Sequence, residues 1–294
     1  MNKALTLSDF GQMLGTLPPR AVKLIQTCDW RYRVLQGKER EAELSALLFR
    51  YHAGDFSKVV EGDKARWDKG WGENLSEFLR TGDPSALVPK FVLRHQAMRL
   101  FGELIRPVDP RFEFNWLRVY QEWLFEQFKP FDAIYEFGCG SAYTLSLLKE
   151  RYDDKKIVGL DWSQPAVDIC TKLGIEGRRF DFFAPNDTEI AENAVVLTFG
   201  ALEQTGAHAG PFIKWLASKR PALCVFSEPI VEWYDKTNVQ DALAVAISDK
   251  RGFMYGLPSL VRQAGGEIVR ERRTGIGSIL LEGYSQLWWK PCAL

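Results

Sequence analysis

Beyond residue 130 the hydrophobic positions change repeatedly between two periods. Short apolar runs typical of buried strands cover Ala133–Phe137, Lys156–Leu160, Arg178–Phe183, Ala194–Phe199 and Ala222–Ser227. Segments with helical spacing lie between or after them, at Ala142–Arg151, Gln164–Leu173, Pro211–Arg220, Asn238–Lys250 and Pro258–Ala264. Two more strand-like runs close the chain, Glu267–Arg273 and Tyr284–Trp289. This repeated β-α-β order predicts an α/β fold, with a mostly parallel sheet covered by helices on both faces.

The first 110 residues have a different, helical pattern. Apolar residues recur at steps of three and four in Pro19–Leu35, Lys38–Ala53 and Asp63–Arg80, and glycines separate these segments. A stronger helix follows, with one apolar face made by Trp116, Leu117, Tyr120, Trp123, Leu124 and Phe128. We therefore expect a helical N-terminal segment over residues 1–110 and an α/β domain over residues 111–294.

Composition and charge exclude several classes of protein. Of the 294 residues 46% are hydrophobic and 26% charged, as in globular proteins, and the formal net charge is zero. Nucleic-acid binding is disfavoured because no basic surface is indicated, and no apolar run reaches the ~20 residues that span a bilayer. Five cysteines without Cys-x-x-Cys spacing fit reduced thiols. We expect a soluble, cytoplasmic protein.

The first strand-like run leads into a glycine-containing turn. Glu136 ends the run, and Gly138, Cys139 and Gly140 connect it to the following helix. Glycines let a ligand approach the backbone closely, and the start of a helix offers free N–H groups. A dinucleotide-binding turn continues to a third glycine, but that position is Tyr143. The turn is therefore not typical of a site for a pyrophosphate.

Acidic residues also end the next two strand-like runs. Asp161 lies about 20 residues beyond the glycines, where an acid can accept both hydroxyls of a ribose. Asp181, in the third run, can accept an exocyclic adenine amine. One such acid alone would suggest a helix cap or a solvated loop. Three acids at successive strand ends favour a nucleoside-binding site instead.

Together these residues resemble the class I S-adenosylmethionine-dependent methyltransferases. The resemblance covers roughly residues 112–294 and implies a Rossmann-like sheet of seven strands, in which Tyr284–Trp289 is the antiparallel last strand. It implies that Glu136 orients the amino group of the cofactor and that Asp161 and Asp181 bind ribose and adenine. The remaining implied cofactor contacts are Gly138, Cys139 and Gly140 for the methionine portion, Trp162 and Phe182 for the adenine ring, and Phe199 at the end of the fourth strand. S-adenosylhomocysteine would be the product.

Catalytic candidates follow the fourth and fifth strands. Methylation of a hydroxyl needs a group that removes its proton, and Glu203 and His208 lie nearest in this fold. Glu203 is equally well explained as an orienting or capping residue, and His208 as an exposed loop residue. Glu228 ends the fifth run and either faces the reaction or bonds a neighbouring loop. No carboxylate cluster indicates a metal site.

The expected acceptor is a small polar molecule, bound in part by the N-terminal segment. This segment loosely resembles that of bacterial methyltransferases acting on sugars or natural products, which implies O-methylation of such an intermediate. Candidate acceptor contacts are Trp67, Trp71, Arg94, His95 and Tyr234, each of which is also explained by core packing or surface exposure. A nicotinamide-dependent oxidoreductase and a catalytically silent interaction protein are the alternatives, and a homodimer stays open.

Overall fold

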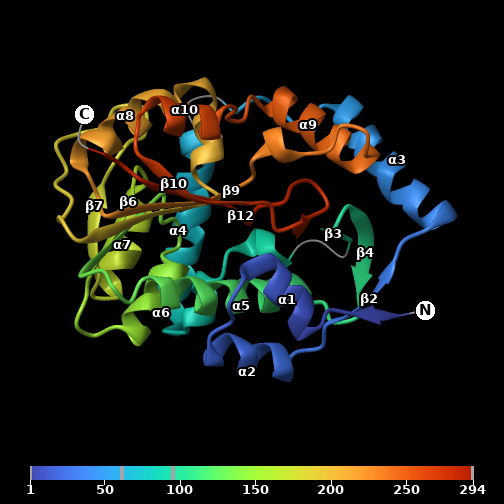
Figure 1. The fold of residues 1–294 in the computed structure, drawn as a ribbon, viewed down its shortest axis with the longest axis horizontal. Coiled ribbons are helices and arrows are strands. Elements are labelled where there is room, and N and C mark those ends of the chain that lie inside the picture. Colours follow the sequence, from blue (N-terminus) through green and yellow to red (C-terminus); the bar gives the residue numbers. More distant parts are fainter. Residues whose placement is uncertain (1, 60–62, 94–96, 293–294) are drawn as a thin grey trace.

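The computed structural model describes residues 2–59, 63–93 and 97–292, and its central feature is a seven-stranded sheet (Figure 1). The strands are β5 (Ala133–Phe137), β6 (Lys156–Asp161), β7 (Glu176–Arg179), β8 (Ala194–Phe199), β9 (Leu223–Glu228), β10 (Glu267–Arg272) and β12 (Ser285–Lys290). Their spatial order is β10-β12-β9-β8-β5-β6-β7, and β12 runs antiparallel to both of its neighbours. The expected α/β fold with an antiparallel last strand is confirmed.

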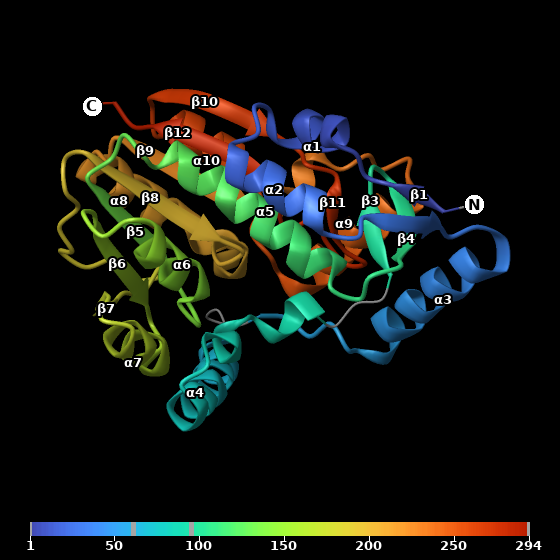
Figure 2. The ribbon, with the colours of Figure 1, turned by 90° about the horizontal axis from the view of Figure 1, so that it is seen from below.

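Helices cover both faces of this sheet because the side chains of each strand alternate between two apolar cores. Ile134 and Val195 belong to the core under α5 (Phe112–Gln127), α6 (Tyr143–Arg151) and α7 (Gln164–Lys172). Tyr135 and Val196 belong to the core under α8 (Ala209–Lys219) and α10 (Leu257–Gln263). Helix α5 lies along the sheet in Figure 2, and eleven of its sixteen residues are buried.

The N-terminal segment contains a second sheet in addition to the expected helices. Its helices are α1 (Leu7–Leu14), α2 (Pro19–Thr27), α3 (Gly37–Ala53) and α4 (Lys64–Thr81), followed by the 3-10 turns η2 (Pro84–Leu87) and η3 (Lys90–Leu93). Its strands are β1 (Lys3–Ala4), β2 (Arg31–Val34), β3 (Met98–Leu100) and β4 (Glu103–Pro107). The fifth strand, β11 (Ile276–Ser278), comes from the other end of the chain and pairs with β3. These strands have five residues or fewer, too short for an alternating pattern to stand out.

Two element boundaries differ from the sequence-based expectation, and the second of them affects the site. Helix α2 ends at Thr27, because Cys28 has extended backbone and β2 starts at Arg31. Strand β7 ends at Arg179, so Asp181 lies in the loop after this edge strand rather than within it. The chain turns there because Phe180 and Phe182 both enter the core beside Phe212.

Two 3-10 segments and helix α9 complete the fold. The 3-10 segments η4 (Leu202–His208) and η5 (Val231–Trp233) follow β8 and β9, and α9 (Val239–Arg251) packs against α3. In the part of the chain that the structure describes, no helix combines the length and apolar character needed to cross a bilayer.

Candidate active site

The glycine turn after β5 is held tightly against β6. Gly138 and Cys139 both donate their N–H groups to the carbonyl of Leu160, at 2.7 and 3.2 Å. Gly138 and Gly140 have φ angles of +74° and +54°, which glycine adopts without strain. A Cβ atom on Gly138 would collide with the side chain of Ala201 in the loop after β8. The turn therefore requires glycine for its conformation and for its close contact with a second loop.

Glu136 provides a buried acid beside this turn. Its side chain is 3% exposed and its Oε2 atom has no hydrogen-bond partner among the described residues. Burial, with a smaller contribution from the charge of Asp161, raises the pKa of Glu136 to about 8. A cationic ligand placed here would satisfy the free oxygen and favour the ionised carboxylate.

Asp161 links the turn to the end of β6. Its Oδ2 atom accepts the N–H of Gly140 at 2.9 Å, and its Oδ1 atom accepts the N–H of Ser163 at 2.8 Å. Burial raises the pKa of Asp161 to about 6 despite these two bonds. Each carboxylate oxygen keeps a second lone pair, so both can still accept a ligand hydroxyl.

Asp181 lies beside a group of aromatic rings. The rings of Trp162 and Phe183 are nearly parallel, with centroids 6.1 Å apart, whereas Phe182 is buried in the core at 4% exposure. Phe182 also lies 3.4 Å from the position that a Cβ on Gly138 would take. Phe183, which sequence reasoning did not single out, is thus the more accessible of the two phenylalanines.

The loop after β8 brings two of the catalytic candidates together. Glu228 accepts the N–H groups of Ala201 and Leu202 at 3.2 Å each and that of Glu203 at 3.4 Å. Glu203 is buried, its Oε2 atom has no partner among the described residues, and burial together with the charge of Glu228 raises its pKa well above the usual range. His208 is exposed at the end of η4, with its ring 5.7 Å from that of Phe183. The two carboxyls therefore differ: Glu228 anchors the loop, and Glu203 retains a free oxygen.

Phe199, at the end of β8, contacts an aromatic cluster that contains another buried acid. Its ring lies 5.7 Å from Tyr120 of α5 and 6.0 Å from Tyr284. The hydroxyl of Tyr284 donates to Oε1 of Glu113 at 3.3 Å, while Oε2 of Glu113 has no partner in the described chain. Burial raises the pKa of Glu113 to about 8. Sequence reasoning missed Glu113, because an acid in the first turn of a helix is normally a solvated residue that favours the helix dipole.

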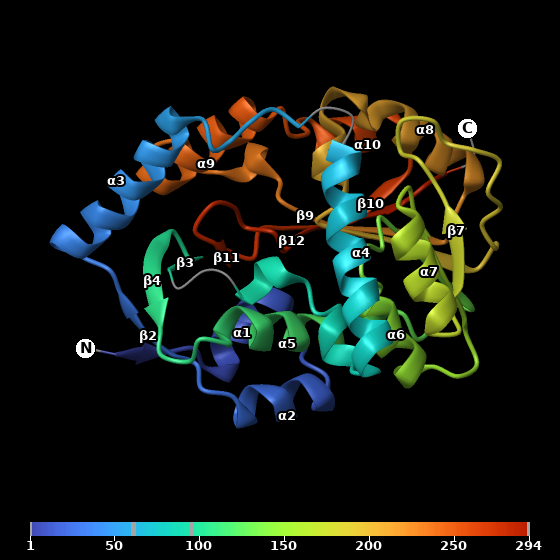
Figure 3. The ribbon, with the colours of Figure 1, turned by 180° about the vertical axis from the view of Figure 1, so that it is seen from behind.

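Helix α4 lies beside α7 (Figure 3). It carries both candidate tryptophans, and Trp71 reaches the glycine turn. Trp67 and Trp71 stack with centroids 5.2 Å apart, and Trp67 donates its Nε1–H to Oε1 of Gln204 at 2.9 Å. A Cβ built on Gly140 would lie 2.7 Å from Cζ2 of Trp71. Lys64, on the same helix, forms an ion pair with Asp181 at 2.5 Å. The other two N-terminal candidates, Arg94 and His95, fall outside the described residues.

Tyr234 lies in a buried ionic cluster rather than beside the glycine turn. The guanidinium groups of Arg99 and Arg273 lie 5.2 and 4.8 Å from its ring centroid. Both arginines form ion pairs with Asp241 and Glu282, which are 2% and 0% exposed at their side chains. The hydroxyl of Tyr234 accepts the N–H of Glu282 at 2.9 Å. Tyr234 is therefore packed among buried charges, and its role as an acceptor contact stays a prediction.

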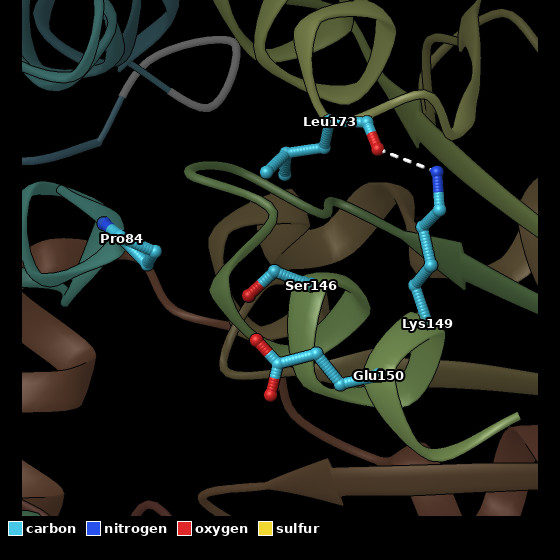
Figure 4. A pocket seen from close by; sticks show the side chains of 5 residues that line it. All are labelled: Pro84, Ser146, Lys149, Glu150 and Leu173. Atoms are coloured by element: carbon cyan, nitrogen blue, oxygen red, sulfur yellow. Dashed lines mark hydrogen bonds between the residues drawn. The ribbon is translucent and has the colours of Figure 1, made fainter. Parts of the chain in front are cut away.

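Two surface cavities lie apart from the turn. One is lined by Pro84, Ser146, Lys149, Glu150 and Leu173, and in it Lys149 donates to the carbonyl of Leu173 at 2.7 Å (Figure 4). The other is lined by residues that include Phe101, Asn238 and Arg273. Among the described residues, no group of three or more His, Cys, Asp or Glu side chains is arranged to hold a metal ion.

No family model matches the sequence, and no curated protein matches it. Similar solved structures include human N-acetylserotonin methyltransferase in complex with S-adenosylmethionine, at 13% identity and a TM-score of 0.44. That match covers 61% of this chain and 55% of the human one, so the chain spans about half the length of that enzyme. N,N-8-amino-8-demethyl-D-riboflavin dimethyltransferase from Streptomyces davawensis matches at 15% identity, over 76% of this chain and 69% of its own, with a TM-score of 0.44. An O-methyltransferase from neocarzinostatin biosynthesis, in complex with S-adenosylmethionine and a naphthoic acid, matches at 14% identity over 83% of this chain and 73% of its own, with a TM-score of 0.42. The chain is thus similar, over part of its fold, to solved structures of S-adenosylmethionine-dependent methyltransferases.

Proposed function

We propose that this protein is a methyltransferase that uses S-adenosylmethionine and methylates a hydroxyl group of a small polar acceptor, such as a sugar or a natural-product intermediate. The observation that carries this proposal is Glu136, a buried acid with a free oxygen beside the glycine turn that Asp161 closes. An α-amino group is a ligand that would satisfy this oxygen. The strand order, with β12 antiparallel between β9 and β10, supports the same assignment.

The residues present fit the cofactor in chemistry and order along the sheet. Glu136 would hold the amino group, Asp161 the two ribose hydroxyls, and Asp181 with Trp162 and Phe183 the adenine. When bound, S-adenosylmethionine supplies an electrophilic methyl group on a sulfonium, which an acceptor oxygen can displace in line. Because such a displacement depends mainly on positioning, a rigid glycine turn and an anchored neighbouring loop are useful properties.

Glu203 is the proposed group that receives the acceptor proton. Its free Oε2 atom can accept a proton, and because its pKa is raised the carboxylate, once ionised, is a stronger base than an exposed glutamate. Glu228 positions the loop that carries Glu203, through three backbone hydrogen bonds, and does not itself need to touch the acceptor. His208 is exposed and remains the rival base. Trp67 and Trp71 are the proposed aromatic contacts of the acceptor.

The antiparallel β12 argues against a nicotinamide-dependent oxidoreductase. Dinucleotide-binding sheets continue with a parallel strand where β12 is inserted here. A silent interaction protein is disfavoured because Glu136 and Asp161 are both buried. Burying a carboxyl costs free energy, which contacts with a ligand would offset.

Binding and transfer assays test the proposal. Calorimetric titration should detect binding of S-adenosylmethionine and of S-adenosylhomocysteine but not of NAD. Glu136→Gln should weaken the binding of the first two compounds by about tenfold, as expected for the loss of one charge-assisted hydrogen bond. Glu192→Gln, which changes an exposed acid, is the matched control. Transfer is then sought by incubating the enzyme with methyl-labelled cofactor and fractionated metabolites. Tight binding of NAD, or no binding of S-adenosylmethionine and S-adenosylhomocysteine, would refute the proposal.

A further inference from the structure

Helix α4 places three large side chains on the residues that would bind the cofactor. Lys64, Trp67 and Trp71 have the spacing i, i+3 and i+7, which puts them on one face of the helix. Their contacts are Asp181, Gln204 and Gly140, which come from three different loops of the sheet. The helix therefore contacts three of the loops at the carboxyl ends of the sheet strands.

The contacts at both ends of this face leave no room for a ligand beneath the helix. Lys64 Nζ is 2.5 Å from Oδ2 of Asp181 and 5.5 Å from the ring centroids of both Trp162 and Phe183. An ammonium thus takes the donor position that an adenine amine would take. At the other end, three ring atoms of Trp71 lie 2.7–3.1 Å from the position of a Cβ on Gly140. A methionine portion passing the turn would meet this indole.

Few side chains of α4 are fully buried, although Leu75 and Phe78 pack half-buried against the main core. Asn74 is the one buried residue among the eighteen of α4, whereas eleven of sixteen are buried in α5. The Lys64–Asp181 pair is partly solvated, with side-chain exposures of 37% and 30%. Segments with few buried apolar contacts separate at a much lower free energy than the global core. Moving α4 away would therefore uncover Leu75 and Phe78 but few fully buried side chains.

We propose that α4 is a plug over the candidate cofactor site, and that cofactor enters only after Lys64 and Trp71 have left Asp181 and Gly140. This inference rests on the proposed methyltransferase function. It differs from the action of a lid that closes over a bound ligand, because a plug slows entry whereas a lid slows escape. The two are distinguished by which rate constant changes.

Stopped-flow tryptophan fluorescence with S-adenosylhomocysteine as the probe measures both rates. We expect Lys64→Ala to raise the association rate constant about two- to fivefold, the range for a partly exposed ion pair, and Trp71→Ala to raise it about tenfold. The dissociation rate constant should stay within twofold of wild type. Lys69→Ala, an exposed change on the same helix, is the control and should leave both constants unchanged.

Two outcomes of this experiment would overturn the plug. Faster dissociation with unchanged association in the Lys64 and Trp71 variants would show that α4 grips bound cofactor, and would overturn the plug. Unchanged rates in folded variants, checked by circular dichroism, would overturn it as well. Either result leaves the methyltransferase assignment intact, because wild type then binds the probe. If the wild type and every variant fail to bind millimolar probe by equilibrium dialysis, the proposed function itself fails and the plug with it.

Discussion

Replacing Glu113 by glutamine should make the protein's stability less sensitive to pH. Glu113 lies in the first turn of α5 at 7% exposure, and Tyr284 donates a hydrogen bond to one of its oxygens. The start of a helix favours a negative charge by roughly 0.3–1 kcal/mol, and by about 2 at most. Desolvation outweighs this, because the pKa of Glu113 is raised from 4.5 to about 8. The folded protein thus holds a proton that the unfolded chain releases.

The magnitude follows from linkage between protonation and folding. Between pH 4.5 and pH 8 the unfolded state binds fewer protons at this site than the folded state, so the free energy of unfolding falls as the pH rises. Integrated from pH 5 to pH 8, a shift of this size removes about 3 kcal/mol of stability. Glutamine preserves the shape and can still accept from Tyr284, but does not titrate. The variant should therefore lose about 3 kcal/mol less than wild type over this range.

Urea unfolding followed by circular dichroism, at constant ionic strength and at several pH values, checks this expectation. Glu192→Gln, at an exposed position, should reproduce the wild-type slope. Glu136→Gln should give a change of similar sign, because its pKa is also raised to about 8. Parallel pH profiles for wild type and Glu113→Gln would refute the claim that this carboxyl is protonated in the fold.

Three further predictions concern the site and its support. Asp161→Asn should weaken S-adenosylhomocysteine binding more than tenfold at pH 7.5, because charge-assisted bonds are worth roughly 1.5–3 kcal/mol each. The affinity of the wild type, measured by calorimetry, should decrease as the pH is lowered through 6, because Asp161 becomes protonated. An identical pH profile in the variant would contradict the role of Asp161 in binding the probe. Glu203→Gln should keep the affinity for S-adenosylhomocysteine within a few-fold of wild type and lower the rate of methyl transfer by ~10². His208→Ala, which changes the rival base, is the comparison. Equal losses in affinity and turnover would assign Glu203 to cofactor orientation. Arg99→Met should lower the free energy of unfolding, measured by urea denaturation, by about 3–5 kcal/mol, because Asp241 and Glu282 then have one arginine partner instead of two. A loss below about 1 kcal/mol would show that Arg273 alone neutralises the two acids.

Chain order and local periodicity were enough to predict the α/β sheet and the position of its first acids. Strands and helices differ in the spacing of their apolar residues, and that spacing is a property of neighbouring positions. Because β5 and β6 are parallel neighbours, their carboxyl ends bring Glu136 and Asp161 to the same edge of the sheet. The placement of β12 next to β9 followed instead from the resemblance to the methyltransferase family, and it was confirmed.

Tertiary structure alone decided which of these polar groups are buried, paired or covered. Glu113 is unremarkable in the sequence. Burial in the core around α5 raises its pKa, although the hydrogen bond from Tyr284, 171 residues away, acts in the opposite direction. Strand β11 is too short to predict and exists because β3 offers it an edge. Lys64 reaches Asp181 across 117 residues. Local sequence determines periodicity and turns, whereas desolvation and ion pairing depend on which distant segments the folded chain packs together, so the position of α4 over the candidate cofactor site became visible only in three dimensions.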